Sequence, residues 1–116
     1  MLNYLQASTR PDIAMAVHQC ARFSADPKIT HERAVMRIGK YLLGTKERGI
    51  KFTPDTSKGV ECHVDADFAG SWDKADFGNP ENVLSRTGYI ISIYGCPVTW
   101  TSKLQTEIAL LTAEAE

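Results

Sequence analysis

The residues of this chain best suited to chemistry lie in one acidic stretch, VDADFAGSWDKAD, which runs from Val64 to Asp76. Acids and a glycine fall at places 1, 3, 6, 9 and 12 of a loop, and they are Asp65, Asp67, Gly70, Asp73 and Asp76. That spacing is most of an EF-hand, whose loop binds calcium through oxygen ligands and turns at a glycine. A second interpretation places DAD at the end of a β-strand, where one carboxylate can serve a magnesium-dependent active site.

The sequence on either side of this stretch favours magnesium over calcium. An EF-hand loop lies between two helices, whereas VECHV before the stretch alternates like a strand, and a glycine and a proline interrupt FGNPENV after it. Magnesium typically binds one or two carboxylates together with water and phosphate oxygens, and a pair of such ions can promote phosphodiester cleavage. Asp65 at the end of a strand, with Glu114 or Glu116 at the start of a terminal helix, are the natural candidates.

Basic and acidic residues are segregated along the chain, although its net charge is only −1. Residues 28–51 hold seven Lys and Arg against two acids, and residues 53–82 hold seven acids against two Lys. Within the basic segment, Arg33, Arg37 and Lys40 line one face of an expected helix. This arrangement suits a protein that cuts nucleic acid, with cations for phosphates and carboxylates for metal. Two solvated surfaces explain the same charges equally well, so that alternative stays open.

Length and composition indicate one domain of ordinary globular type. The chain has 116 residues, of which 43% are hydrophobic and 23% are charged. No apolar run is long enough to span a membrane, and MLNYLQASTRPD lacks the layout of a signal peptide, so an intracellular protein is expected. The three cysteines are odd in number and far apart, which favours reduced thiols.

Hydrophobic periodicity predicts an α+β fold in which helices come first and strands afterwards. Two helices, over residues 9–24 and 26–44, should form a hairpin, with Thr9 as the cap of the first. Extended segments should follow at residues 49–53, 60–66, 87–93 and 97–102, the last two as a hairpin that turns at Gly95, and residues 108–116 should begin a helix. The expected core consists of Phe23, Ile38, Leu42, Val64, Tyr89, Ile91 and Trp100.

Taken together, these motifs resemble the Pol polyprotein of copia-type retrotransposons. The resemblance rests on five stretches in the family's order: YLQASTRPDIAMAVHQCARFSADP, HERAVMRIGKYLLGTKERGIKF, HVDADFAG, SRTGYIISIYGCPVTWTSKLQTEIAL and TAEAE. It covers essentially the whole chain and implies the end of the reverse transcriptase region at residues 1–53, then the N-terminal part of a ribonuclease H domain at residues 60–116. The implied fold is a two-helix hairpin followed by an incomplete ribonuclease H-like antiparallel sheet of about three strands.

The same resemblance implies an activity and assigns residues to it. Such a ribonuclease H hydrolyses the RNA strand of RNA–DNA hybrids by two-metal catalysis with Mg²⁺. The leading Asp of the D-x-D-[WF]-A-G motif corresponds to Asp65, and the last Glu of the T-E-A-E-Y motif corresponds to Glu116, which makes these two the implied catalytic and metal-binding carboxylates. Asp67 and Glu114 belong to the same motifs without that role. The implied partners are an RNA–DNA hybrid and the rest of the reverse transcriptase polyprotein.

Departures from the family pattern limit what the chain is expected to do alone. Leu111 and Ala113 stand where the family usually has Ser or Thr, and the family's remaining acidic ligands and its polymerase carboxylates are not in the sequence. A fragment without nuclease activity of its own is therefore expected. Two alternatives remain, a non-catalytic nucleic-acid-binding remnant that uses Arg33, Arg37 and Lys40, and a calcium-binding loop at residues 65–76.

Overall fold

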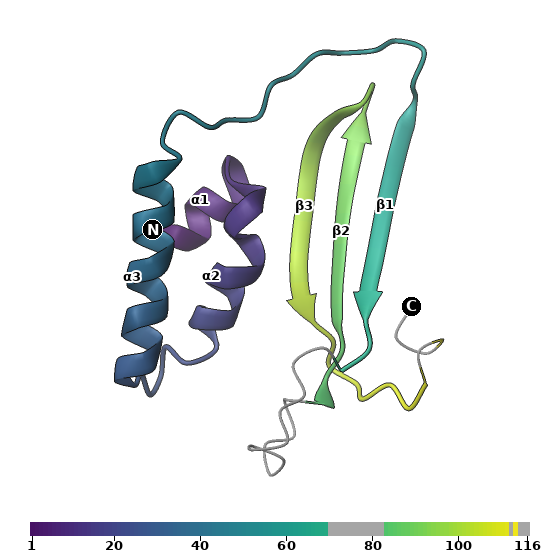
Figure 1. Cartoon of the computed structure of the whole chain (residues 1–116). Coiled ribbons are helices and arrows are strands. Elements are labelled where there is room, and N and C mark those ends of the chain that lie inside the picture. Colours follow the sequence, from purple (N-terminus) through teal and green to yellow (C-terminus); the bar gives the residue numbers. More distant parts are fainter. Residues whose placement is uncertain (70–82, 112, 114–116) are drawn as a thin grey trace. The chain divides into compact units, whose positions relative to one another are not determined.

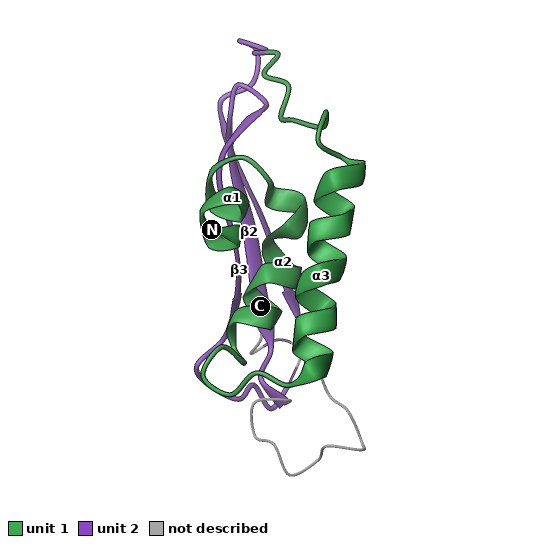
Figure 2. Ribbon diagram, turned by 90° about the vertical axis from the view of Figure 1, so that its left-hand side faces the viewer, with its two compact units in different colours: residues 1–53 green, residues 54–116 purple. Residues whose placement is uncertain are grey.

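The computed structural model has an α+β architecture in which helices precede strands, as the sequence predicts. It describes residues 1–69, 83–111 and 113. The chain divides into two compact units, Met1–Thr53 (unit 1) and Pro54–Glu116 (unit 2), which Figure 2 shows in different colours. Unit 1 holds the helices and unit 2 holds the strands, so each unit is described by itself. No helix in the described part of the chain is long and apolar enough to cross a membrane.

Unit 1 contains the predicted helical hairpin and a further helix in front of it. The elements are α1 (Leu2–Ser8), the 3-10 helix η1 (Pro11–Ile13), α2 (Ala14–Ala21) and α3 (Ile29–Gly44) (Figure 1). Pro11 opens η1, where its missing N–H costs no hydrogen bond. The predicted capping role of Thr9 is wrong, because Thr9 ends α1 and its hydroxyl donates to the Leu5 carbonyl at 3.4 Å.

A small apolar core holds the helices of unit 1 together. Ile13, Val17 and Ile38 are buried, and a ring of partly buried side chains packs against them: Leu2, Leu5, Cys20 and Leu42. Leu2 and Leu5 are three residues apart, which places both on one face of α1. Phe23, a predicted core residue, is 36% exposed because it lies beyond the end of α2, where its ring stacks on His31 at 4.2 Å between centroids.

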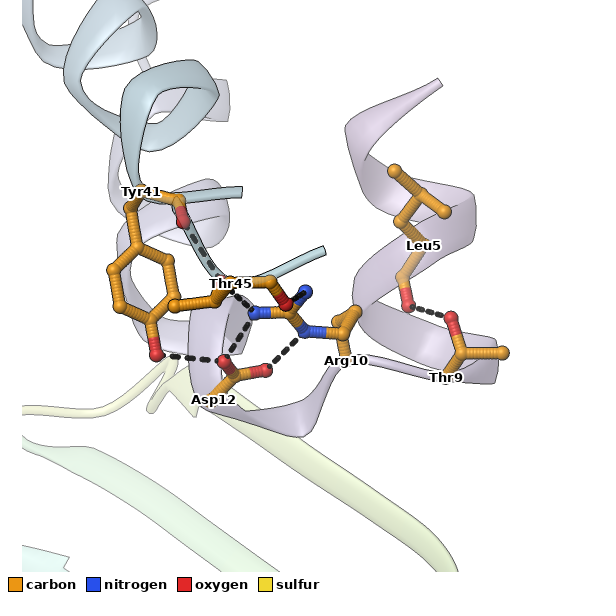
Figure 3. A network of polar contacts seen from close by, with 6 residues as sticks. All are labelled: Leu5, Thr9, Arg10, Asp12, Tyr41 and Thr45. Atoms are coloured by element: carbon orange, nitrogen blue, oxygen red, sulfur yellow. Dashed lines mark hydrogen bonds and ion pairs between the residues drawn. The ribbon is translucent and has the colours of Figure 1, made fainter. Parts of the chain in front are cut away.

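A polar network joins the start of η1 to the end of α3 (Figure 3). The buried Arg10 donates to both carboxylate oxygens of Asp12, at 2.9 and 2.7 Å, and to the Thr45 carbonyl at 3.2 Å. Since Thr45 is the C-cap of α3, the guanidinium supplies positive charge where the helix dipole is negative. The Tyr41 hydroxyl donates to Asp12 at 2.8 Å. The hydrogen bonds from Arg10, followed by that from Tyr41, lower the pKa of Asp12 to about 2.

Unit 2 is an antiparallel sheet with the order β1-β2-β3 (Figure 1). Its described strands are β1 (Val60–Asp67), β2 (Arg86–Ile93) and β3 (Cys96–Leu104). The predicted strand at residues 49–53 is wrong, because these residues pair with no described strand and stay irregular. The predicted helix at residues 108–116 lies mostly outside the described residues.

The β2–β3 hairpin turns at Tyr94 and Gly95, close to the predicted position. Both residues have positive φ, 53° and 74°, as a two-residue turn of type I′ requires. The turn is tied to the segment before β1, since Tyr94 accepts a hydrogen bond from the Asp55 N–H at 2.9 Å and donates to the Gly59 carbonyl at 3.0 Å.

The sheet residues predicted to form a core are more exposed than expected. Val64 is 61% exposed and Tyr89 is 36% exposed, while Ile91 and Trp100 are half-buried. Val64 lies on an outer strand of the described sheet. Strand alternation predicts which face of the sheet a side chain lies on, but it does not predict whether another element buries that face.

Candidate active site

The side chains of β1 divide between two faces of the sheet. In an antiparallel ladder, residues directly opposite each other point to the same side, and neighbours along a strand point to opposite sides. Asp65 pairs with Gly88, which pairs with Ser102, and Asp67 pairs with Arg86. One face of β1 therefore carries Glu61, His63, Asp65 and Asp67, and the other carries Val60, Cys62, Val64 and Ala66.

Asp65 is exposed, and its carboxylate makes no hydrogen bond or ion pair with the residues that the structure describes. Its ladder neighbour Gly88 has no side chain, so β2 leaves the face open beside the carboxylate. A strand holds the backbone of Asp65 in place while both carboxylate oxygens remain accessible. This is a suitable arrangement for a metal ligand.

Asp67 has a different environment, although it lies on the same face two residues further along. Its Oδ1 accepts a hydrogen bond from the Arg86 N–H at 2.7 Å. The bond satisfies a backbone donor at the start of β2 and fixes the last rung of the β1–β2 ladder. Asp67 is therefore engaged in holding the sheet, which distinguishes it from Asp65.

Two polar residues at the start of β2 were not singled out from the sequence. Ser85 is completely buried, and its Oγ accepts a hydrogen bond from the Ala69 N–H at 3.3 Å. Arg86 is 6% exposed, and its Nη1 donates to the Ser102 Oγ at 3.2 Å. The available signal was the polar pair in LSRTGYI directly before an apolar strand, because buried Ser and Arg side chains require partners.

The described residues fit only part of the implied magnesium site. Among them, no group of three or more His, Cys, Asp or Glu is placed to hold a metal ion. Asp65 alone fits the chemistry of one carboxylate ligand of Mg²⁺, an ion that keeps several of its waters. Glu116 and Glu114 lie outside the described residues.

The structure before the proposed calcium-binding loop differs from that of an EF-hand. Its first and third positions, Asp65 and Asp67, belong to strand β1, whereas an EF-hand loop follows a helix. The carboxylate of Asp67 is also hydrogen-bonded to the backbone of Arg86. Positions 6, 9 and 12, which are Gly70, Asp73 and Asp76, lie outside the described residues.

Arg33, Arg37 and Lys40 lie on α3 in unit 1, and all three are exposed. Their spacings of four and three residues place them on one side of the helix. None of them makes a hydrogen bond or an ion pair with another residue in the described ranges. This basic stripe is therefore available to an anionic partner.

Comparison with known proteins identifies relatives of the entire chain. No family model matches it, and no solved structure does. The "Secreted RxLR effector protein 161" of Plasmopara viticola is 36% identical over 113 residues, which are 97% of this chain and 74% of that protein. The "Retrovirus-related Pol polyprotein from transposon TNT 1-94" of Nicotiana tabacum is 40% identical and that from transposon RE1 of Arabidopsis thaliana is 37% identical, each over 99% of this chain.

The matched segment is a small part of the polyprotein relatives. It spans 8% of the TNT 1-94 polyprotein and 7% of the RE1 polyprotein. The similarity nevertheless runs through both units of this chain, since 115 of its residues are aligned in each case. The chain is therefore homologous to a segment of retrotransposon Pol polyproteins.

Proposed function

We propose that this chain is the part of a Pol polyprotein in which the reverse transcriptase region runs into a ribonuclease H domain, and that Asp65 is a metal-binding carboxylate of that nuclease. The observation that carries the proposal is the difference between the two neighbouring acids. Asp65 is exposed and uncommitted on a strand, whereas Asp67 is bound to the backbone of Arg86. Similarity to Pol polyproteins over the whole chain supports the assignment to this family of enzymes.

The chemistry assigned to the site is hydrolysis of the RNA strand of an RNA–DNA hybrid. Bound Mg²⁺ ions would supply an activated water and stabilise the leaving oxygen, which is the role of paired metals in phosphodiester cleavage. Asp65 would contribute one ligand from a rigid strand, and Glu116 is the proposed second carboxylate.

A chimaera tests this proposal, because the relatives extend beyond the matched segment. The 116-residue chain would be joined to the residues that follow this segment in the RE1 polyprotein, and cleavage of a labelled RNA–DNA hybrid would be followed with magnesium. Asp65→Asn should remove most of the activity because it removes a charged ligand. Asp67→Asn, the matched control, should keep most of it because an amide oxygen still accepts the Arg86 N–H. A chimaera that is active with Asp65→Asn would refute the assignment.

A second function, nucleic-acid binding by α3, is favoured by the uncommitted basic stripe. Replacing Arg33, Arg37 and Lys40 with Gln should weaken binding of a labelled hybrid and reduce the slope of log affinity against log salt by about 0.9 per lost phosphate contact. The control replaces Lys58 and Lys103 of unit 2 with Gln. Binding that is insensitive to salt, or equally weakened in the control, would exclude α3 as the contact surface.

The effector role printed in the name of the Plasmopara viticola relative is not proposed for this chain. The TNT 1-94 and RE1 polyproteins are 40% and 37% identical to this chain and the Plasmopara viticola protein is 36% identical, so sequence identity alone gives that role no preference.

A further inference from the structure

Gly88 lies inside strand β2, between Asp65 of β1 and Ser102 of β3 in the ladder. We infer that Gly88 is a specificity-determining position: its missing side chain leaves room beside Asp65 for a phosphate group of a nucleic-acid backbone that is bound through a divalent cation. This inference rests on the proposed function of Asp65 as a metal ligand. The open position on the sheet face between Asp65 and Ser102 is here named the Gly88 gap.

The backbone of β2 gives no reason for a glycine at position 88. Glycine in a strand costs conformational entropy and packs no side chain, so it often marks a bulge, a positive φ, or the close approach of a ligand or another backbone. The pairing is regular at Gly88, since the irregularity of the β2–β3 ladder lies between Ile91 and Ser92. The φ of Gly88 is not positive, in contrast to that of Gly95.

Neighbouring atoms do not exclude a side chain from position 88 either. A Cβ built there would meet the Thr101 carbonyl oxygen at 3.7 Å and the Asp65 carbonyl oxygen at 3.9 Å, which are ordinary van der Waals distances. Apart from the neighbours of Gly88 along the chain, no side-chain atom of the described residues lies within 4 Å of that Cβ. The approach of a ligand to this face is the reason for a glycine that remains.

Asp65 supplies the cation-binding side of the Gly88 gap. Residues paired directly in an antiparallel ladder point to the same face, so Asp65 and Ser102 stand on either side of Gly88. Two strand spacings, about 9.5 Å, separate them, which is too far for a direct hydrogen bond. The Asp65 carboxylate is exposed and makes no hydrogen bond or ion pair with the described residues, so it can bind a cation.

Ser102 supplies a hydrogen-bond donor from the other side of the gap. Its Oγ accepts from the Arg86 Nη1 at 3.2 Å, and a guanidinium only donates, so this bond does not use the Ser102 O–H. Within the described part of the chain that O–H has no acceptor. A phosphate oxygen is such an acceptor. A cation ligand on one side and a donor on the other therefore suit a phosphate group that carries a divalent cation.

A side chain at position 88 would stand on this face and fill the gap. Ala adds one methyl group, and Val adds a larger side chain that is common in strands. Both should leave the sheet at least as stable as it is with glycine, and both should hinder a phosphate beside Asp65. A purely structural role of Gly88 would instead make stability fall.

Urea unfolding of the 116-residue chain tests the first of these effects. The midpoints of Gly88→Ala and Gly88→Val should equal or exceed that of the wild type. Ala66→Val is the matched control, because Ala66 adjoins Asp65 in β1 and lies on the opposite face. A midpoint of Gly88→Ala clearly below that of the wild type would show that the fold requires the glycine, and would overturn the inference.

Binding of a labelled RNA–DNA hybrid, measured with Mn²⁺ and with EDTA, tests the second effect. Mn²⁺ prefers oxygen ligands as Mg²⁺ does, and it should tighten binding by the wild-type chain but not by Asp65→Asn. Gly88→Val should reduce this gain roughly tenfold, an effect of the size seen when the surroundings of a metal site are altered. Binding in EDTA, and the gain in Ala66→Val, should match the wild type. Ser102→Ala should also reduce the gain, and Ser102→Thr, which keeps the hydroxyl, should restore it.

The outcomes separate this inference from the proposed function. A gain that persists in Asp65→Asn, or no gain in the wild type, refutes Asp65 as the metal ligand and the inference with it. A full gain in Gly88→Val, together with its loss in Asp65→Asn, refutes the role of the Gly88 gap and leaves the proposed function intact. Binding by Gly88→Val that weakens equally in EDTA would also overturn the inference, because the effect would not depend on the cation.

Discussion

A buried arginine is costly unless each of its donors finds a partner, and Arg10 meets that requirement within unit 1. Its guanidinium binds Asp12 through two donors and Thr45 through its carbonyl at 3.2 Å and its Oγ1 at 2.7 Å. A lysine could not reproduce this forked geometry. The residue pair Arg10 and Asp12 therefore belongs to the scaffold of the helices and takes no part in the proposed chemistry.

The stability of unit 1 should depend on pH through Asp12. Its folded-state pKa of about 2 lies below the ordinary value of 3.8, so its contribution is complete above pH 5 and is lost as the pH falls through 2. The carboxylate is 36% exposed, and screening reduces the expected contribution to about 1 kcal/mol. Urea unfolding of Asp12→Asn between pH 2 and 6 should show that loss at pH 6 and a flatter pH profile than the wild type. Asp26→Asn is the control, and identical profiles for wild type and Asp12→Asn would contradict the assignment.

The resemblance alone assigned the catalytic role to Asp65 and not to Asp67, because residue type and strand parity do not separate the two. Both residues are aspartates of the same motif, and their spacing of two places them on the same face of a strand. Residue type and spacing therefore give no reason to prefer one of them. The difference arises from the β1–β2 register, which places the Arg86 N–H beside the carboxylate of Asp67. Register depends on long-range pairing, and no local pattern in HVDADFAG encodes it.

At the scale of elements, the hairpin β2–β3 depends on a turn with one well-suited and one poorly suited residue. Gly95 adopts φ 74° without penalty, whereas Tyr94 adopts φ 53° despite its Cβ. Type I′ turns favour Asn before Gly for this reason. The sequence signalled the turn through Gly95, and the strength of the flanking strands then forces Tyr94 into the left-handed region.

Substitutions at these two positions should have opposite effects on stability. Gly95→Ala should lower the free energy of unfolding by about 1–2 kcal/mol because of its positive φ, and Tyr94→Asn should raise it by a smaller amount. Gly59→Ala is the matched control, since a Cβ there meets no atom within 4 Å. Midpoints of urea unfolding measure all three. A Gly95→Ala variant as stable as Gly59→Ala would show that the turn differs from the one described.

Elements were predicted best where a long pattern and a turn signal agreed. Helix α3 and the β2–β3 hairpin satisfy both conditions and lie close to the expected residues. Helix α1 was missed because its seven residues are too few for a clear period, and it depends on packing Leu2 and Leu5 against Ile13 and Val17. Residues 49–53 show the opposite case. Their sequence favours an extended backbone, but they pair with no described strand and therefore form no strand themselves.

At the scale of the whole molecule, the division into two compact units implies that damage to one unit stays local. Asp12→Asn should quicken amide exchange in α2 and α3 and leave β1, β2 and β3 unchanged, and Gly95→Ala should do the reverse. The double variant should show the sum of the two effects, because the described partners of Asp12, which are Arg10 and Tyr41, lie in unit 1, and the described neighbour of Gly95, Lys58, lies in unit 2. Residue-resolved exchange by NMR measures this. Quicker exchange around Ile38 in Gly95→Ala would mean that the units are coupled.

The acidic face of β1 also affects how copies of the chain meet at high concentration. In the described sheet β1 is an outer strand, and an outer strand is a template for pairing with another chain unless charged side chains guard it. Glu61, Asp65 and Asp67 bring like charges together whenever two such strands approach edge to edge. The proposed metal ligand Asp65 and its acidic neighbours on β1 thus also oppose self-association. Neutralising Asp65 and Asp67 together removes two of these charges from each copy and favours intermolecular sheets.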